Sequence, residues 1–467
     1  MSNKLGLPNK FLIVILLTIL VLVLPTPSGL SLSGKRALAA FVFTGTIFAL
    51  QPVPLPFAGL MVHILIAGLG LTESRTAFES LSRPIIILIL GSLFLAEALR
   101  KYGLTRRLAL KSIVLSGGGI KELLFGLMSI ASLLSMWMEN TATAAILIPV
   151  ALTISNQVEE EEQSNKILIM LVLGIAYAAS IGGMATITGS ASNAVASEFL
   201  SEIRIWTFLD WMKYGLPSLI VIFPITWYFL IKQFKFTIVK IDIEKPKKDL
   251  EDLGNLQKNE LEVIIILVIT IILWISGPIF EAYLGLPPSF MSPAIVGVIA
   301  VSYLALRGII VWEDVKGVSW GMFFAIAAGL SLGDALKRSG ATEWMTEIIS
   351  PIIKGSPYLL SLLLLVFASI ILTNIINNAT VAAVFVPILI QIALADPSFK
   401  SIQLVLPLTM GTTFGYALPS ASGRMALISA TGIIPQKDMF RYGMILSLIS
   451  GLVLVSFFYI VNFLNLI

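Results

Sequence analysis

Two short polar stretches interrupt long apolar segments of this chain, and their side chains are of types that bind ions. The first, residues 136–143, contains a Glu, an Asn and two Thr within the apolar segment Leu123–Ile154. The second, residues 373–380, contains three Asn and two Thr. Unpaired polar groups are costly in hydrocarbon, so such clusters persist only inside protein or beside a watery cavity. Two breaks, one in each half, predict a transporter binding site built from an internal repeat.

The first tip combines side chains that could serve an anion and a cation together. It includes Ser135, Glu139, Asn140, Thr141 and Thr143. Helix N-termini offer free N–H groups to an anion, and unwound carbonyls offer oxygens to a cation. Asn and Thr supply neutral donors and acceptors. Polar pairing between neighbouring helices is the alternative, but the recurrence of the pattern favours a binding site.

Each polar tip is followed by an apolar segment that small residues interrupt. Residues 182–193 read Gly-Gly-Met-Ala-Thr-Ile-Thr-Gly-Ser-Ala-Ser-Asn, and residues 411–424 contain glycine, threonine and serine with Pro419. Glycine allows close approach of the backbone to an ion, and proline removes a backbone donor. These features predict two broken helices; tight packing of small residues between helices is the alternative.

Glu139 and Arg424 are the charges that cannot reach an interface if these segments span a membrane. Charges inside a membrane usually mark a substrate site or an ion path, and a mutual ion pair is the structural alternative. His63 is expected to be a packed or interfacial histidine rather than a ligand.

Composition places the chain in the membrane and excludes several kinds of chemistry. Of its 467 residues, 57% are hydrophobic and 12% are charged, whereas soluble domains carry about 25% charged residues. There is no cysteine and one histidine, which excludes thiol chemistry and argues against zinc sites and histidine-based triads. The net charge of +4 is attributed to basic loops, so no nucleic-acid partner is expected. The run 11–24 is read as a first membrane helix, because no small-x-small cleavage site follows it.

The fold class expected is all-α and polytopic, with about eleven transmembrane helices, two re-entrant helical hairpins and an inverted repeat. Segments 121–155 and 355–395 are too long for one helix and too broken for two spans, which predicts the hairpins. The expected spans are residues 10–24, 36–51, 56–72, 84–101, 166–200, 213–232, 261–283, 289–306, 318–338, 401–430 and 441–465.

The distribution of Lys and Arg predicts orientation and domain limits. The basic loops 100–111 and 232–248 belong in the cytoplasm. The first hairpin then opens from the cytoplasm and the second from outside. The expected divisions are N-terminal scaffold helices at 1–55, a first repeat at 56–235, a cytoplasmic linker at 236–260 and a second repeat at 261–467.

The repeat can be followed residue by residue. Residues 139–145 (Glu-Asn-Thr-Ala-Thr-Ala-Ala) align with residues 377–383 (Asn-Asn-Ala-Thr-Val-Ala-Ala), and a proline follows each, Pro149 and Pro387. Further on, residues 189–193 align with residues 419–423. The order of hairpin and then broken helix thus occurs twice.

These motifs resemble the divalent anion:sodium symporter family, the sodium-coupled dicarboxylate, citrate and sulfate transporters. The resemblance rests on residues 83–91, 99–110, 312–315, 320–321, 329–330 and 339–344, on both tips and on both broken helices. It implies a homodimer, a scaffold half that holds the dimer, and a transport half that moves like an elevator. It also implies that sodium is the coupling ion, with no other cofactor.

The family's Ser-Asn-Thr tip motif carries over only in part. Asn140 and Thr141 match the first motif and Asn378 the second, while Gly189 and Asn193 match the first broken helix. The departures are that Glu139 and Asn377 each replace a Ser, Ala379 replaces a Thr, and residues 422–424 (Ser-Gly-Arg) stand where the family has Pro-Pro-Asn.

The sequence therefore predicts a multi-pass transporter of the cytoplasmic membrane, and not an enzyme, that carries a small dicarboxylate such as succinate or malate with sodium. An anion exchanger or an oxyanion permease is the alternative; Arg424 could replace one sodium ion or pair with the anion. The expected substrate-binding residues are Asn140, Thr141, Asn378, Ala379, Thr380, Ser422 and Arg424. The expected cation-binding residues are Ser135, Glu139, Asn140, Gly189, Asn193, Thr373, Asn377 and Asn378.

Overall fold

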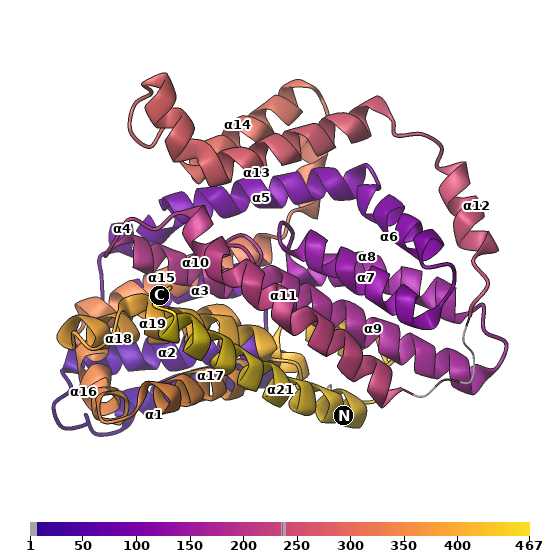
Figure 1. Cartoon of the computed structure of the whole chain (residues 1–467). Helices are drawn as coiled ribbons and strands as arrows, with labels where there is room; N and C mark the ends of the chain where they lie inside the picture. Colours follow the sequence, from indigo (N-terminus) through magenta and orange to yellow (C-terminus); the bar gives the residue numbers. More distant parts are fainter. Residues whose placement is uncertain (1–6, 235, 237–239) are drawn as a thin grey trace.

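The structure is a computed structural model that describes residues 7–234, 236 and 240–467. Over these residues the chain is helical, and the one β-bridge joins Gly119 to Lys240. Figure 1 shows the helices packed into one body, with α5, α13 and α14 along one edge. The α-helices are α1 (Leu7–Val23), α2 (Leu32–Leu50), α3 (Leu55–Gly68), α4 (Ser74–Glu79), α5 (Pro84–Lys101), α6 (Leu104–Leu115), α7 (Ile120–Ser135), α8 (Asn140–Ser155), α9 (Glu161–Met184), α10 (Ala191–Ser201), α11 (Phe208–Gln233), α12 (Glu244–Asp252), α13 (Lys258–Leu284), α14 (Pro293–Leu306), α15 (Trp320–Arg338), α16 (Ala341–Lys354), α17 (Tyr358–Ile375), α18 (Asn378–Ala395), α19 (Ser401–Gly411), α20 (Gly423–Thr431) and α21 (Gln436–Phe463).

Every apolar segment predicted from the sequence contains helix. By length and composition, six helices of the described chain could each cross a membrane, or seven if a bent pair that includes α5 forms one span. Several other predicted spans are shorter helices, such as α3 and α14, or are split in two. The chain is thus all-α with multiple apolar helices, as predicted; the number of spans stays a prediction.

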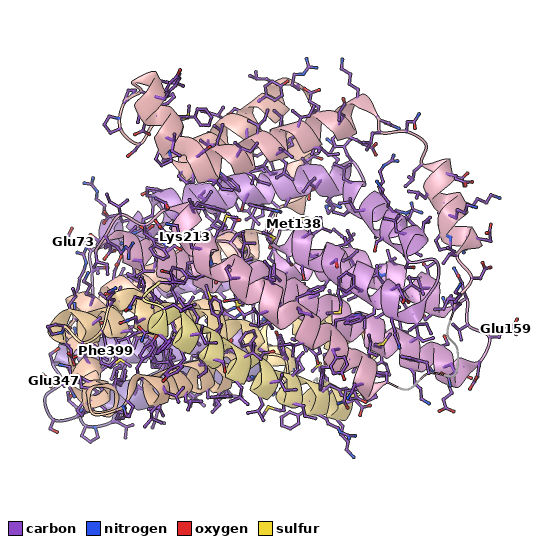
Figure 2. All side chains as sticks on the ribbon, in the orientation of Figure 1. Glu73, Met138, Glu159, Lys213, Glu347 and Phe399 are labelled. Atoms are coloured by element: carbon purple, nitrogen blue, oxygen red, sulfur yellow. The ribbon has the colours of Figure 1, made fainter. Side chains whose placement is uncertain are left out.

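Each predicted hairpin segment contains two helices joined by a short turn; that the hairpins are re-entrant stays a prediction, because α17 and α18 are each long and apolar enough to cross a membrane. Residues 136–139 separate α7 from α8, and residues 376–377 separate α17 from α18. In Figure 2, Met138 at the first tip lies near the centre of the molecule, whereas Glu159, just beyond α8, lies at its edge. The first hairpin therefore carries its polar tip into the interior, where Met138 is 2% exposed.

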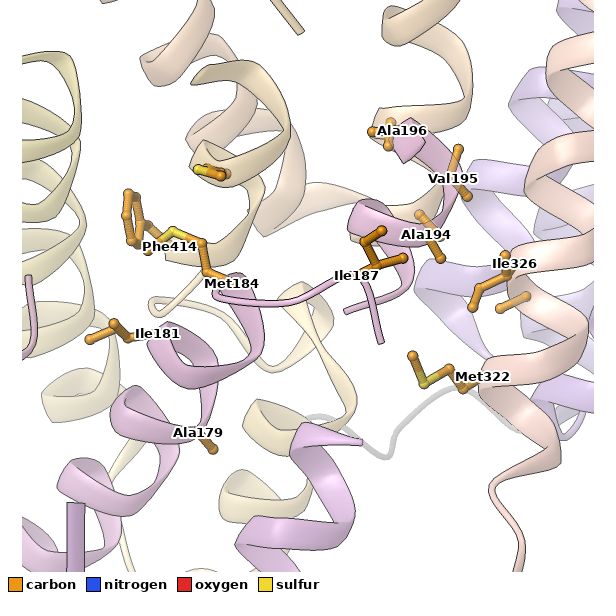
Figure 3. Packing of buried hydrophobic residues seen from close by; sticks show 14 of the residues in the cluster. Ala179, Ile181, Met184, Ile187, Ala194, Val195, Ala196, Met322, Ile326 and Phe414 are labelled. Carbon is orange, nitrogen blue, oxygen red and sulfur yellow. The ribbon is translucent and has the colours of Figure 1, made fainter. Parts of the chain in front are cut away.

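Both segments predicted to be broken helices are interrupted. The first stops at the end of α9 and resumes at α10, after Ser190 with an extended backbone. The second runs from α19 through short 3-10 helices at Thr412–Phe414 and Pro419–Ala421 to α20. Figure 3 shows the irregular segment between Met184 and the start of α10, with Met322 and Ile326 of α15 nearby. Each break leaves main-chain polar groups that need partners in the interior.

A helix from each half of the chain packs against a helix from the other half. Helix α3 packs on α15, and α14 packs on α5. Glycines permit both approaches: a Cβ atom added to Gly59 would lie 2.8 Å from the carbonyl oxygen of Phe324, and one added to Gly91 would lie 3.1 Å from Cα of Gly297. These pairs form a framework beside the hairpins. Helix α9 is buried in the core, whereas α13 leaves large apolar side chains such as Ile272 and Ile279 exposed.

Four helices were not predicted from apolar runs: α4, α6, α12 and α16. Each is shorter than a span. Helices α6 and α16 each precede a hairpin and begin after a glycine with positive φ, Gly103 and Gly340. Helix α12 lies in the predicted polar linker. Their short length or polar composition explains why span counting missed them.

Candidate functional site

Both hairpin tips and both helix breaks face one cavity of about 280 Å³. Framework helices α3 and α15 complete its wall. The cavity is lined by Leu55, Glu139, Asn140, Thr141, Gly189, Ser190, Ala191, Ser319, Gly321, Met322, Ala325, Asn377, Asn378, Ala421, Ser422, Gly423 and Arg424. Residues more than 200 positions apart in the sequence thus share one site.

Four helix N-termini meet at this cavity. Helix α8 begins at Asn140, α10 at Ala191, α18 at Asn378 and α20 at Gly423, and all four residues line the wall. The first turn of a helix has unpaired N–H groups and a partial positive charge, so an anion is favoured there. The convergence of four such ends makes the cavity electropositive apart from its acidic side chain.

The first half-site gathers oxygen atoms around Asn140. One terminal atom of its amide lies 2.9 Å from Ser135 Oγ, 3.0 Å from the carbonyl oxygen of Ala179 and 3.2 Å from that of Gly189. This atom is Nδ2, which donates to all three oxygens, because Oδ1 would face only other acceptors there. Each of these oxygens keeps a second lone pair, and oxygens of this kind are the ligands of a hard cation.

Hydrogen bonds from the α9–α10 linker hold this half-site in shape. Asn193 Nδ2 donates to the carbonyl oxygens of Gly183, at 2.9 Å, and Thr186, at 2.7 Å. The hydroxyls of Thr186 and Thr188 both donate to the carbonyl oxygen of Met136 at the hairpin tip. Asn193 Oδ1 is buried and accepts no hydrogen bond from the described residues. The buried polar groups of the linker thus brace the tip and leave an oxygen available.

The second half-site repeats part of this arrangement. Thr373 lies five residues before Asn378, as Ser135 lies five before Asn140, and its hydroxyl donates to Asn378 Oδ1. Asn377 Oδ1 accepts from the Ala379 N–H at 2.8 Å and caps α18. This N–H group is therefore already paired.

Asn374 joins the second tip to the second helix break. Its Oδ1 accepts from the Ala417 N–H at 3.1 Å, and its carbonyl oxygen accepts from the Ser420 hydroxyl at 2.8 Å. This residue positions the break without lining the cavity. It was not among the predicted site residues, although its polar type within the second tip was a signal for it.

Glu139 and Arg424 both line the cavity without forming an ion pair. Within the described chain, no nitrogen of Arg424 comes within 4.0 Å of a carboxylate oxygen of Glu139. Glu139 accepts a hydrogen bond from the Ser319 hydroxyl at 3.3 Å. Arg424 is 2% exposed; its Nη2 donates to the Thr413 carbonyl at 3.2 Å, and its Nε has no partner among the described residues.

The predicted site residues fall into two groups. Those that line the cavity are Glu139, Asn140, Thr141, Gly189, Asn377, Asn378, Ser422 and Arg424. Those buried behind its wall are Ser135, Asn193, Thr373, Ala379 and Thr380. The second group includes two predicted substrate ligands, Ala379 and Thr380, whose side chains do not reach the cavity.

Sequence reasoning missed the framework side of the wall. Leu55, Ser319, Met322 and Ala325 come from α3 and α15 or precede them. Ser319, Met322 and Ala325 lie in a segment assigned as a plain span, and Leu55 lies between two such segments. The Trp320-Gly321 motif was the one signal there. His63 is a packed histidine, as expected: it stacks on Phe78 at 5.2 Å between ring centres, and Nδ1 lies 2.8 Å from the Gly59 carbonyl oxygen.

The fold and the site together are typical of a multi-pass membrane transporter, with two helical hairpins and two broken helices around one cavity. The chain belongs to the family described as the sodium:sulfate symporter transmembrane region, which matches residues 7–464. The predicted family is thereby confirmed.

Similar proteins span nearly the whole chain. An uncharacterized transporter of Haemophilus influenzae is 31% identical over 436 residues, covering 91% of both chains. The sodium-dependent dicarboxylate transporter SdcS of Staphylococcus saprophyticus is 28% identical, covering 95% of this chain and 89% of its own. The crystal structure of the Alcanivorax borkumensis YdaH transporter has a similar fold, with a TM-score of 0.54 and 13% identity, over 87% of this chain and 89% of that one. These relatives are transporters rather than enzymes.

Proposed function

We propose that this protein is a secondary active transporter that couples sodium to the movement of a small divalent anion, specifically a dicarboxylate such as succinate or malate. The observation that carries the proposal is the convergence of four helix N-termini and the Arg424 guanidinium on one cavity. Membership of a sodium:sulfate symporter family and similarity to a sodium-dependent dicarboxylate transporter support it.

Neutral donors supply the contacts that a carboxylate needs. Asn140 and Thr141 face the cavity from the first tip, Asn378 from the second, and Ser422 from the second break. Opposite tips separated by a cavity suit a molecule with an anionic group at each end. Asn and hydroxyl side chains can donate to carboxylate oxygens, and the helix N-termini stabilise the charge.

Sodium supplies the remaining positive charge. An anion inside the membrane is costly unless it is paired. The oxygens of Ser135, Ala179 and Gly189, which also accept from the Asn140 amide, and the unpartnered Asn193 Oδ1 are of the ligand type that suits a sodium ion. Glu139 adds a carboxylate beside the same tip. These residues are the proposed cation ligands of the first half, and Thr373, Asn377 and Asn378 hold the corresponding positions in the second.

The arrangement of the helices supports an elevator mechanism. Helices α3, α5, α14 and α15 would form part of a static framework, and the hairpins with the broken helices would move as the transport half, carrying the cavity with them. In this proposal residues 1–55 join the scaffold, residues 56–235 and 261–467 are inverted repeats, and residues 236–260 are the cytoplasmic linker. The protein would work as a homodimer in the cytoplasmic membrane, with exposed apolar side chains of α13 meeting lipid or the partner.

Uptake by purified protein in liposomes tests the proposal. Labelled succinate is offered with sodium or with choline outside, and unlabelled succinate, malate, citrate, sulfate and phosphate compete. Saturable, sodium-dependent uptake that the dicarboxylates inhibit best is expected. Absence of saturable uptake of any of these anions would overturn the proposal.

Anion exchange without sodium, or transport of sulfate or another oxyanion, is the alternative function. The fixed charge of Arg424 at the cavity favours it, because a guanidinium can neutralise an anion without a dissolved cation. Counterflow separates the two: uptake that needs internal anion and ignores sodium indicates exchange. Counterflow also excludes a channel, which would not show it.

A further inference from the structure

Arg424 is a buried cation whose only described hydrogen bond is to a main-chain carbonyl. It is 2% exposed, its Nη2 donates to Thr413, and its Nε is unpartnered. No carboxylate of the described chain lies within 4.0 Å of it. Buried charges are normally paired. An unpaired guanidinium on the wall of a cavity therefore points to an anionic partner that binds in the cavity.

No charged side chain braces the helix break of the first repeat. There Asn193 Nδ2 donates to the carbonyl oxygens of Gly183 and Thr186. In the second repeat the Arg424 guanidinium reaches the Thr413 carbonyl at the corresponding break. A neutral amide thus contacts main-chain carbonyl oxygens at the first break, and a cation does so at the second. The guanidinium adds a permanent positive charge to the cavity wall.

Glu139 gives the first half the opposite charge. Its carboxylate lies at the N-terminal end of α8, where Glu139 precedes Asn140, and it lines the cavity. A dissolved cation is attracted to this half and repelled from the half that holds Arg424. Because Glu139 and Arg424 do not pair directly, neither charge cancels the other at short range.

We infer that the two half-sites divide the charge between a dissolved and a tethered cation: the first half binds one sodium ion beside Glu139, and Arg424 takes the place of a second. This inference rests on the proposed function and sets its coupling at one sodium ion in the cavity per anion. The anion lies between them, with one carboxylate toward the sodium ion and the other toward Arg424.

Sodium binding alone gives the first test. Thermal unfolding of the purified protein in detergent is followed against sodium concentration, with choline at constant ionic strength, because a ligand of the native state raises its stability. Wild type is expected to follow a curve with a Hill coefficient of about one. Glu139→Gln is expected to raise the sodium concentration for half effect at least about tenfold, whereas Arg424→Gln shifts it by less than about threefold. A wild-type coefficient near two, or an unchanged Glu139→Gln, overturns the inference.

Binding of labelled succinate gives the second test. Arg424→Gln is expected to weaken succinate binding at saturating sodium at least about tenfold, and Arg424→Lys less, because Lys keeps the charge. Arg441→Gln, which removes an exposed Arg of α21, is the matched control and should not change binding. Unchanged succinate affinity in Arg424→Gln overturns the inference. If wild type binds sodium with a coefficient near one but no succinate, the proposed dicarboxylate function fails while the sodium half of the inference stands.

Discussion

Asn193 donates a hydrogen bond from Nδ2 to the carbonyl oxygen of Gly183 over 2.9 Å, and this bond closes the break between α9 and α10. The Asn193 side chain is fully buried. At the end of α9 the carbonyl groups have lost their helical partners, so the amide satisfies groups that would otherwise be buried alone. The shape of the first half-site thus depends on one side chain that lies behind the cavity wall.

Replacing Asn193 by Asp should damage the protein more than replacing it by Ala. Asp has nearly the same shape, but an ionised carboxylate cannot donate to the carbonyl oxygens of Gly183 and Thr186. Asn193→Ala should cost about 1–3 kcal/mol of stability, and Asn193→Asp more, because it buries an unpaired charge. Thermal unfolding in detergent measures both. Equal stability of Asp and Asn variants would show that this amide does not hold the break.

Gly183 should be intolerant of any side chain. A Cβ atom there would lie 2.5 Å from one terminal atom of the Asn140 amide and 2.7 Å from the carbonyl oxygen of Gly189. Gly183→Ala is therefore expected to displace Asn140 and raise the sodium concentration needed for uptake at least about tenfold. Gly68→Ala is the control, because its Cβ would meet nothing within 4 Å. Normal sodium dependence in Gly183→Ala would remove Asn140 from the cation site.

Local sequence patterns predicted the helices, hairpins and breaks because each buried backbone N–H and C=O group needs a hydrogen-bond partner, and the local sequence largely decides whether a helix supplies it. Polar and small residues within an apolar run, such as residues 182–193, indicate a helix break buried in the protein, because lipid cannot pair the freed backbone groups. The match between residues 139–145 and 377–383 also showed that the two tips are related. From this match it followed that both tips belong to one site, and the cavity contains both.

Long-range packing determines the features of the cavity that local sequence patterns did not predict. Ser319 and Met322 reach the cavity because α15 packs beside α3, which no local pattern records. Thr380 has the residue type of a ligand, but its position in the first turn of α18 turns its hydroxyl into the core. Whether Glu139 and Arg424 pair also depended on tertiary distance. Residue type indicated the candidate ligands, and the side of the helix on which each residue lies decided which of them line the cavity.

Thr141 and Thr380 therefore make a matched test of the site. Thr141 lines the cavity, whereas Thr380 is fully buried and its hydroxyl has no partner in the described structure. Thr141→Val should weaken anion binding about three- to tenfold through loss of one hydrogen bond. Thr380→Val keeps the shape and should leave binding unchanged and stability equal or higher. Competition by succinate measures both; the reverse order would place Thr380 in the site.

A network of charges joins α10, which carries one side of the cavity, to the framework. Arg83 Nη2 lies 2.6 Å from Asp334 of α15, and Arg83 Nη1 lies 3.6 Å from Glu198 of α10. Glu202, just beyond α10, contacts both Arg83, at 3.5 Å, and Lys337 of α15, at 3.2 Å. These side chains are partly buried, so screening by solvent is incomplete.

Arg83→Gln should destabilise the resting state and, if the proposed elevator is right, speed its motion. Three carboxylates lose their shared cation, which should cost about 1–3 kcal/mol and lower the unfolding temperature. Lys166→Gln, which breaks the exposed pair with Glu162, is the control and should change it little. If α10 must separate from α15 during transport, the turnover of Arg83→Gln should rise. The reason is that the substitution removes ion pairs that stabilise the state in which α10 contacts α15. A loss of turnover together with stability would show instead that α10 and the framework stay joined throughout the cycle.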